Sequence, residues 1–341
     1  KLARECEAKI AVVGEASCLP TLREALSGSG TEAAGGPQAL TEAAARPVDL
    51  TVAAIVGCAG LAPTMAAIEQ GGTVALANKE ALVSAGEVMT AAVARHGATL
   101  LPVDSEHNAI FQCLQGHDLG DVRAITLTAS GGPFRTWSAD KIAAATPAQA
   151  VAHPNWDMGA KISVDSATMF NKGLELIEAH HLFPVGLEKI RILIHPQSVV
   201  HSLVEYCDGS TLAQLGPADM RVPIASCLAW PRRMETPMAP LDLAALGTLH
   251  FEAPDEARFP ATRIAREAAQ AGGSAPAVLN AANEIAVAAF LGGHIAFTDI
   301  ALSVERVLAT GNQPPPPRSL DDVLALDAAT RARARAELEL A

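Results

Sequence analysis

Two acidic residues follow a short apolar run near the middle of the chain. Residues 99–103 read as a buried strand, and Asp104 and Glu106 come directly after it. If the extended geometry continues, both side chains leave the backbone on the same side. Two carboxylates held together repel each other unless a cation lies between them, and oxygen ligands suit Mg²⁺ or Mn²⁺. The pair indicates a divalent-metal site; a helix N-terminus capped by Asp104 and Ser105 is the alternative.

A second polar stretch, residues 162–175, has the residue types of a phosphate site. Asp165 or Ser166 is placed to cap a helix that begins near Ala167. The free N–H groups at such a helix start attract an anion. This stretch therefore predicts that Ser166 lies at an anion-binding helix N-terminus.

The same stretch continues with an amide, an ammonium and a carboxylate. Asn171 and Lys172 suit a phosphate monoester, and Glu175 shares a helix face with Asn171 because four residues separate them. That face would bring Glu175 to the metal while its neighbours hold phosphate. An exposed, salt-bridged helix face is the alternative for Lys172 and Glu175.

Three shorter stretches also carry ligand-type side chains. Ser130 begins a Gly-Gly-Pro turn after a predicted strand, where the backbone can approach a ligand closely. Residues 151–159 join His153 and Trp156 in a turn-rich loop, as a lid over a ligand would need. Lys79 follows a predicted strand and would point into the ligand crevice. The alternatives are an ordinary turn, a packed tryptophan and a solvated lysine.

The glycine-rich signal of a dinucleotide site is weak in this chain. Residues 28–33 fit the loose G-x-G-x-x-A pattern, but a helix precedes them and no strand does, so a helix-terminating turn is favoured. Residues 57–60 do follow a strand and open a helix, but they lack the full fingerprint. A tight strand-to-helix turn remains open there.

The elements that must position these residues fall into four regions. Short apolar strands alternate with helical patterns in residues 1–105, which predicts a parallel sheet wrapped by helices. Residues 230–257 are proline-rich and read as a linker. Alanine-rich helical patterns beyond it predict a small helical bundle. We expect a Rossmann-like nucleotide domain (1–105), an α+β catalytic, metal and substrate domain (106–229), a linker (230–257) and a C-terminal bundle (258–341).

Composition narrows the function classes. The 341 residues carry a formal net charge of −12, so nucleic acid is a poor partner for this chain. The six cysteines have no zinc-ligand spacing and suit the reduced thiols of a cytoplasmic protein. No apolar run reaches the length of about 18 residues that a membrane span requires.

Taken in order, these stretches resemble the successive motifs of the 1-deoxy-D-xylulose 5-phosphate reductoisomerase family. The resemblance covers essentially the whole chain, and it includes residues 282–284. The motifs that carry it are Asn78-Lys79-Glu80, Val103-Asp104-Ser105-Glu106-His107, Ser130-Gly131-Gly132-Pro133-Phe134, His153-Pro154-Asn155-Trp156, Ser163-Val164-Asp165-Ser166-Ala167-Thr168-Met169, Asn171-Lys172-Gly173-Leu174-Glu175 and His195-Pro196-Gln197-Ser198.

The resemblance implies a role for each matching position. It implies Asp104, Glu106 and Glu175 as metal ligands, and Lys79, Glu106 and His153 as catalytic residues. The implied substrate-binding residues are Lys79, Ser105, Glu106, Ser130, His153, Trp156, Met158, Ser166, Asn171, Lys172 and Glu175. The implied cofactor-binding residues are Ala54, Ile55, Val56, Gly57, Asn78, Lys79, Glu80, Gly159 and Met220.

The resemblance also implies an activity. Members of the family use NADPH and Mn²⁺ or Mg²⁺ to rearrange and reduce 1-deoxy-D-xylulose 5-phosphate to 2-C-methyl-D-erythritol 4-phosphate, usually as homodimers, in non-mevalonate isoprenoid synthesis. The family's N-terminal glycine-rich loop has no match here, so we expect a chain that lacks its first βαβ unit. A binding-only fragment, a different nicotinamide oxidoreductase and a metal-dependent sugar-phosphate isomerase or aldolase are the alternatives.

Overall fold

The computed structural model describes residues 1–152, 158–310 and 314–339. The chain divides into two compact units, one of residues 1–78 and 89–101 and the other of residues 79–88 and 102–341. No helix among the described residues is long and apolar enough to cross a membrane.

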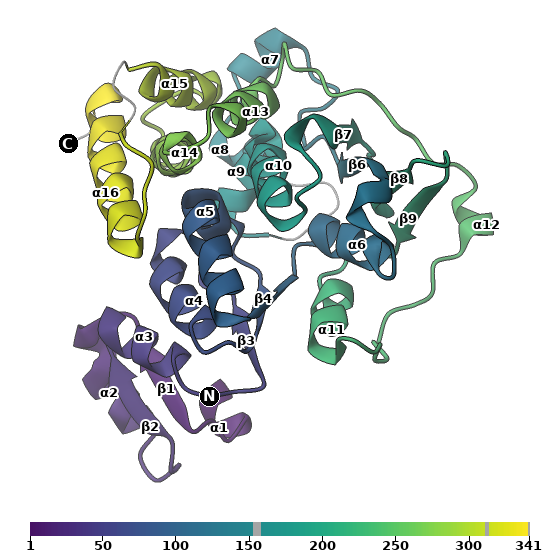
Figure 1. The fold of residues 1–341 in the computed structure, drawn as a ribbon. Coiled ribbons are helices and arrows are strands. Elements are labelled where there is room, and N and C mark those ends of the chain that lie inside the picture. Colours follow the sequence, from purple (N-terminus) through teal and green to yellow (C-terminus); the bar gives the residue numbers. More distant parts are fainter. Residues whose placement is uncertain (153–157, 311–313, 340–341) are drawn as a thin grey trace. The chain divides into compact units, whose positions relative to one another are not determined.

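The first unit alternates strands and helices, as the apolar pattern predicts (Figure 1). Strands β1 and β2 pair in parallel, and β3 and β4 pair in parallel in a separate sheet with β5. Strand β4 is apolar and nearly fully buried. The elements of the first unit are α1 (Leu2–Glu5), β1 (Ile10–Val13), α2 (Leu19–Ala25), β2 (Glu32–Gly35), α3 (Pro37–Ala44), β3 (Leu50–Ala53), α4 (Leu61–Ile68), β4 (Thr73–Leu76), α5 (Lys79–His96, whose first ten residues belong to the second unit) and β5 (Thr99–Pro102).

The second unit contains a four-stranded mixed sheet in the order β7-β6-β8-β9. Strands β6 and β7 run parallel, whereas β8 pairs antiparallel with both β6 and β9. Helices α6 and α10 contact this sheet and carry most of the acidic residues considered below. The elements before residue 230 are α6 (Ser105–Leu114), β6 (Val122–Ala129), α7 (Ala139–Ala143), α8 (Pro147–Ala150), α9 (Ala160–Thr168), α10 (Phe170–Leu182), β7 (Ile190–Ile194), β8 (Val200–Tyr206), β9 (Thr211–Leu215) and α11 (Arg221–Ala229).

Four long helices follow the proline-rich segment. Helix α13 buries Ala261, Ile264, Ala265 and Ala268, the spacing of one helix face. The aromatic rings of Phe134, Phe290 and Phe297 pack together, so the helices share a core with the sheet region. The proline-rich segment itself contains the short helix α12 (Leu243–Leu246), and the four long helices are α13 (Ala261–Ala271), α14 (Ala275–Leu291), α15 (Phe297–Ala309) and α16 (Leu320–Glu337).

The predicted fold class is confirmed: parallel α/β structure comes first, then a mixed sheet with helices, then a helical C-terminal region. The pattern missed β2 and α3, which are short and rich in alanine. Residues 28–30 form a turn after α2, with positive φ at Gly28 and Gly30, as the helix-terminating interpretation expects.

Candidate active site

Three helices of the second unit bring the predicted acidic residues together. Asp104 precedes the first residue of α6, Glu106 lies in its first turn, and Glu175 lies on α10. Lys79 is the first residue of α5. All four side chains are largely buried, with exposed fractions between 1% for Glu175 and 18% for Glu106.

Lys79 and Lys172 bind these carboxylates from two sides. The ammonium group of Lys79 contacts Asp104 and lies 3.1 Å from Oε1 of Glu175. The ammonium group of Lys172 contacts Glu175 and lies 3.0 Å from Oε1 of Glu106. Glu175 therefore joins the two lysines, and the three predicted metal ligands lie in one cluster. Lys79 is buried and is not the solvated lysine of the alternative interpretation.

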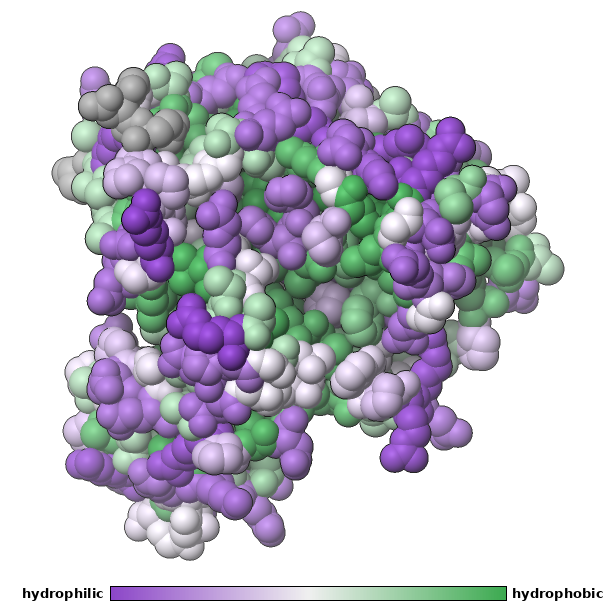
Figure 2. All heavy atoms as spheres, viewed as in Figure 1, coloured by the Kyte–Doolittle hydropathy of each residue, from purple (hydrophilic) through white to green (hydrophobic). Residues whose placement is uncertain are grey.

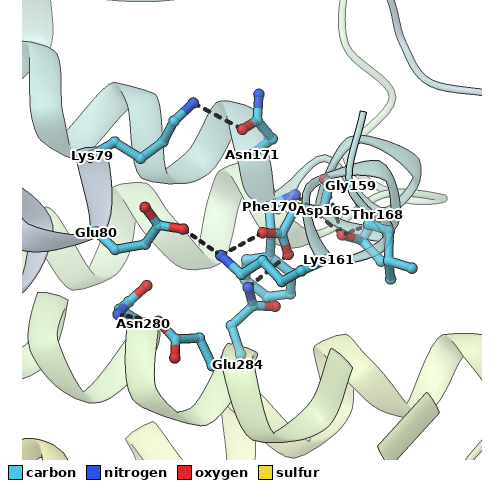
Figure 3. A network of polar contacts seen from close by, with 12 residues as sticks. Lys79, Glu80, Gly159, Lys161, Asp165, Thr168, Phe170, Asn171, Asn280 and Glu284 are labelled. Carbon is cyan, nitrogen blue, oxygen red and sulfur yellow. Dashed lines mark hydrogen bonds and ion pairs between the residues drawn. The ribbon is translucent and has the colours of Figure 1, made fainter. Parts of the chain in front are cut away.

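Asn171 completes this part of the cluster. Its Oδ1 accepts a hydrogen bond from Nζ of Lys79 at 2.9 Å, which Figure 3 shows, and its Nδ2 donates to Oε1 of Glu175 at 2.5 Å. Ser105 donates to Oε2 of Glu106 at 2.5 Å. The amide and the hydroxyl thus fix the orientation of two of the three carboxylates.

Two buried residues that the sequence interpretation left without a role belong to the same cluster. Nε2 of His107 lies 2.8 Å from the backbone oxygen of Glu175, and its Nδ1 lies 3.3 Å from Oε2 of Glu178. Both side chains are fully buried. The signal for Glu178 was available, because it lies three residues after Glu175 on the same helix face.

Burial and neighbouring charge shift the pKa values of these groups. Burial and the charge of Glu175 raise the pKa of Glu106 to about 7, although Lys172 opposes that shift. Burial opposes the charged form of Lys79, but Asp104, Glu175 and Glu178 raise its pKa well above the usual value. Burial disfavours ionised Asp104, yet Lys79 holds its pKa well below the ordinary range. The cluster is thus a buried, strongly interacting group of charges.

The donor set fits a divalent cation. Asp104, His107 and Glu175 each offer one ligand atom, and these atoms lie within 4.8 Å of one another. Among the described residues, both carboxylate oxygens of the buried Glu178 lack a hydrogen-bond partner. A buried site with several carboxylates has an affinity for a hard cation that would offset their mutual repulsion.

The segment predicted to hold phosphate differs from expectation in one respect. Helix α9 already begins at Ala160, so Ser166 lies in its last turns and not at a helix N-terminus. Asp165 is not a cap; it has an ion pair with Lys161 one turn earlier. The helix ends at Met169, whose φ of 69° is left-handed, and α10 begins at the next residue.

The Ser130 turn lies against the same helix. Oγ of Ser130 accepts a hydrogen bond from the backbone N–H of Gly132 at 3.1 Å. Gly132 has a φ of +68°, and a Cβ built there would lie 2.6 Å from the backbone oxygen of Ser166. Glycine is therefore required at this position for the turn to approach α9. The structure brings Ser130 and Ser166 into the same neighbourhood.

The loop predicted to cover the substrate is only partly described. His153 and Trp156 lie outside the described residues. Met158 is half-buried just before α9, and Gly159 is the exposed residue at the N-cap of that helix. The roles assigned to these four residues stay predictions.

The predicted cofactor residues belong to both units, and each group is described separately. In the first unit, Ala54, Ile55 and Val56 are exposed, and Nδ2 of Asn78 donates to the backbone oxygen of Gly57 at 3.0 Å. This bond fixes the turn after β3.

In the second unit, Met220 is exposed before α11, whereas Glu80 is buried. Oε1 of Glu80 lies 2.8 Å from Nζ of Lys161. A cofactor contact at Glu80 would therefore come from its backbone.

Comparison with known proteins identifies relatives over nearly the whole chain. Residues 1–86 match the family model for 1-deoxy-D-xylulose 5-phosphate reductoisomerase, residues 100–183 match the model for its C-terminal domain, and residues 215–333 match a second C-terminal domain model for DXP reductoisomerase. The reductoisomerase of Zymomonas mobilis is 60% identical over 99% of this chain and 87% of its own length. That of Rhodospirillum centenum is 58% identical over 96% of this chain and 82% of its own length.

Solved structures of reductoisomerases are also similar to this chain. The Zymomonas mobilis enzyme in complex with NADPH superimposes with a TM-score of 0.93 at 58% identity, covering 99% of this chain and 87% of the other. A DOX-P reductoisomerase in complex with NADPH, fosmidomycin and magnesium gives a TM-score of 0.95 at 44% identity, covering 99% and 88%. With these matches beside the acidic cluster of α5, α6 and α10, the chain belongs to the 1-deoxy-D-xylulose 5-phosphate reductoisomerase family.

Proposed function

We propose that the chain converts 1-deoxy-D-xylulose 5-phosphate to 2-C-methyl-D-erythritol 4-phosphate, as an NADP-dependent oxidoreductase of non-mevalonate isoprenoid synthesis. The observation that carries the proposal is the buried cluster in which Lys79 and Lys172 join Asp104, Glu106 and Glu175. Family membership and the phosphate-type residues beside this cluster support the same reaction.

The cofactors are NADPH and a divalent metal, Mg²⁺ or Mn²⁺. Asp104, Glu106 and Glu175 would hold the metal, with residues 54–57, Asn78 and Met220 near NADPH. When bound, the metal polarises the ketone and hydroxyl oxygens of the sugar, and NADPH supplies hydride. Solved relatives with NADPH and magnesium support this assignment.

The side chains of this unit have distinct tasks toward the substrate. Lys172, Asn171, Ser166 and Ser130 hold the phosphate group, since they combine a buried ammonium with neutral hydrogen-bond donors. Lys79 orients the sugar's carbonyl end beside the carboxylates. Because the phosphate is remote from the reacting carbons, its binding energy is available to order the site and exclude water.

Replacing Glu106 with Gln tests the proposal. We expect Glu106→Gln to abolish NADPH oxidation with the sugar phosphate while thermal unfolding changes little, because the amide keeps the shape but loses the ligand charge. The matched control is Glu205→Gln on β8, whose carboxylate bonds Arg123 and Arg191 at the surface. Near-normal turnover in Glu106→Gln would contradict the metal assignment.

Three control measurements separate the alternatives. Turnover of the sugar phosphate without NADPH would favour a metal-dependent isomerase or aldolase. Equal turnover of the unphosphorylated sugar would favour a different nicotinamide oxidoreductase. Binding of the sugar phosphate with Mn²⁺, without any turnover, would favour the binding-only alternative.

The chain is also proposed to act as a homodimer in the cytoplasm. Strand β9 is an edge strand of its sheet, and Leu212 on it is 40% exposed. Leu243 and Phe251 are also exposed, and Figure 2 shows hydrophobic residues at the right-hand edge, where Figure 1 places α12. An unprotected edge strand with apolar neighbours suits pairing with a second copy. The six cysteines, all among the described residues, form no disulfide bond, which suits a reducing compartment.

A further inference from the structure

Lys161 lies at the start of α9 and binds two carboxylates from different helices. Its Nζ is 2.8 Å from Oε1 of Glu80 on α5 and 2.8 Å from Oδ2 of Asp165, one turn later on α9. Figure 3 shows the lysine extended between the two acids. The ion pair with Glu80 therefore ties the first turn of α9 to the first turn of α5.

A third helix joins this arrangement. Oδ1 of Asp165 accepts a hydrogen bond from Nδ2 of Asn283 on α14 at 2.8 Å. Asp165 is 1% exposed and Asn283 is fully buried. We refer to Glu80, Lys161, Asp165 and Asn283 as the Lys161 clamp. It is a continuous polar chain from α5 through α9 to α14.

The clamp is a charged group in a buried setting. Burial disfavours the charged form of Lys161, but Asp165 and Glu80 raise its pKa above the ordinary value. Burial likewise opposes ionised Glu80, and Lys161 lowers its pKa. Removing one partner of a buried ion pair leaves an uncompensated charge, so the geometry of such a group is strongly fixed.

Both acids of the clamp are next to residues that the proposed function uses. Glu80 directly follows Lys79, which binds Asp104 and Glu175. Asp165 directly precedes Ser166, whose backbone oxygen lies against the Ser130 turn at Gly132. A shift of α9 relative to α5 would therefore change the spacing between Ser166 and the lysine at the acidic cluster.

We propose that Lys161 is a positioning residue, which holds α9 against α5 so that Ser166 and Lys79 engage the two ends of one sugar phosphate. This inference rests on the proposed function and adds a specific role for the C-terminal helices, because Asn283 of α14 fixes the acid that binds Lys161. The clamp itself does not touch the reacting atoms.

A second polar chain, which shares α5 and α14 with the clamp but not α9, provides a matched control. Nδ2 of Asn280 on α14 lies 3.3 Å from Oγ of Ser84 on α5 and donates to Oε1 of Glu284 at 3.1 Å. Glu284 also binds Arg331 on α16. Among the described residues, this second group of contacts joins α5, α14 and α16 and includes no contact with α9. Loss of Glu284 should weaken helix packing but leave Ser166 in place.

The kinetic test compares Lys161→Met, Lys161→Arg and Glu284→Gln. We expect Lys161→Met to lower kcat/KM for the sugar phosphate roughly 10- to 100-fold, mostly through KM, because a displacement of about 1 Å can cost 100-fold. The KM for NADPH should stay unchanged, and Lys161→Arg should recover most of the loss. Glu284→Gln should keep the KM for the sugar phosphate at the wild-type value.

A second readout does not depend on activity. Hydrogen exchange of the amides in residues 160–168 should accelerate in Lys161→Met, and in the Glu80→Gln/Lys161→Met double variant if the single variant does not fold, but not in Glu284→Gln. Unchanged exchange and kinetics in a folded Lys161→Met, or an equal rise in KM in Glu284→Gln, would overturn the inference. A wild-type chain without turnover would instead refute the proposed function, and the exchange result would still decide whether the clamp holds α9.

Discussion

At the scale of single residues, Glu175 is the point at which the charges of the cluster meet. Its two oxygens bind different lysines, and its backbone oxygen bonds His107. Each lysine in turn holds one of the other two proposed metal ligands. Replacing Glu175 would therefore disturb both halves of the cluster, whereas a change at Glu106 affects one half. This difference makes Glu106 the cleaner site for a kinetic test.

A half-buried histidine away from this cluster gives a prediction about pH. The ring of His181 packs against Gly86 of α5, and burial and the neighbouring His180 lower its pKa to about 4. An unfolded histidine has a pKa of about 6.5, so the unfolded chain takes up this proton first as pH falls. The contribution of His181 to the free energy of unfolding is therefore complete above pH 6.5. It is lost as pH falls from 6.5 to 4, by up to about 3 kcal/mol in all.

Urea unfolding at several pH values measures this effect. We expect His181→Gln to flatten the dependence of unfolding free energy on pH in that window, and the exposed His117→Gln to leave it as in the wild type. An unchanged slope in His181→Gln would show that this ring is not held neutral by burial.

At the scale of elements, the junction of α10 and α13 depends on a glycine inside a helix. A Cβ built on Gly173 would lie 2.7 Å from Cβ of Ala265 and 3.1 Å from the backbone oxygen of Ala261. Alanine normally favours a helix interior by about 1 kcal/mol over glycine. Here the close packing reverses the sign, because the added methyl group has no space.

We expect Gly173→Ala to destabilise the protein by about 1–3 kcal/mol, the usual cost of overpacking. The measurement is the midpoint of chemical unfolding. The double variant Ala265→Gly/Gly173→Ala should recover part of the lost stability, because it removes the nearest methyl group. A Gly173→Ala protein more stable than the wild type would show that α10 and α13 are not this close.

Elements with strong apolar patterns could be predicted from sequence, and those set by tertiary contacts could not. The helical region after residue 260 was predicted, since its alanine-rich segments follow a helical pattern. Helix α9 was predicted to begin seven residues late, because Asp165 and Ser166 are typical capping residues. In the structure the side chain of Asp165 lies inside the helix and binds Lys161 and Asn283 instead of capping the backbone. Asn283 is 118 residues away in the chain.

The same limit applies to the candidate site. The residue types of Asp104, Glu106 and Glu175 indicated a shared site, and the structure places them in one cluster. The extended backbone expected at residues 104–106 was wrong, because helix α6 begins at Ser105. The sequence left two interpretations of Lys79 open, a lysine that points into the ligand crevice and a solvated lysine, because its surroundings depend on how α5 meets α6 and α10. Glu178 was missed because its partner His107 lies 71 residues away in the chain.

At the scale of the whole molecule, the sheet edge at β9 has a predicted consequence for assembly. We expect the wild-type chain to be a dimer in light scattering and Leu212→Lys to shift it to monomer, because like charges would meet across a symmetric edge. The control is Leu302→Lys on α15, which is similarly exposed but lies outside this sheet. Dimers of Leu212→Lys as stable as the wild type would place the interface elsewhere.

One divalent cation, held by carboxylates at α6 and α10, is the centre of the proposed active site. Electron paramagnetic resonance of Mn²⁺ titrated into the protein measures the bound ion directly. We predict one tight site per chain in the wild type, its loss in Glu175→Gln, and its retention in Glu188→Gln, which changes a residue outside the cluster. Equal Mn²⁺ binding by the wild type and Glu175→Gln would contradict the account.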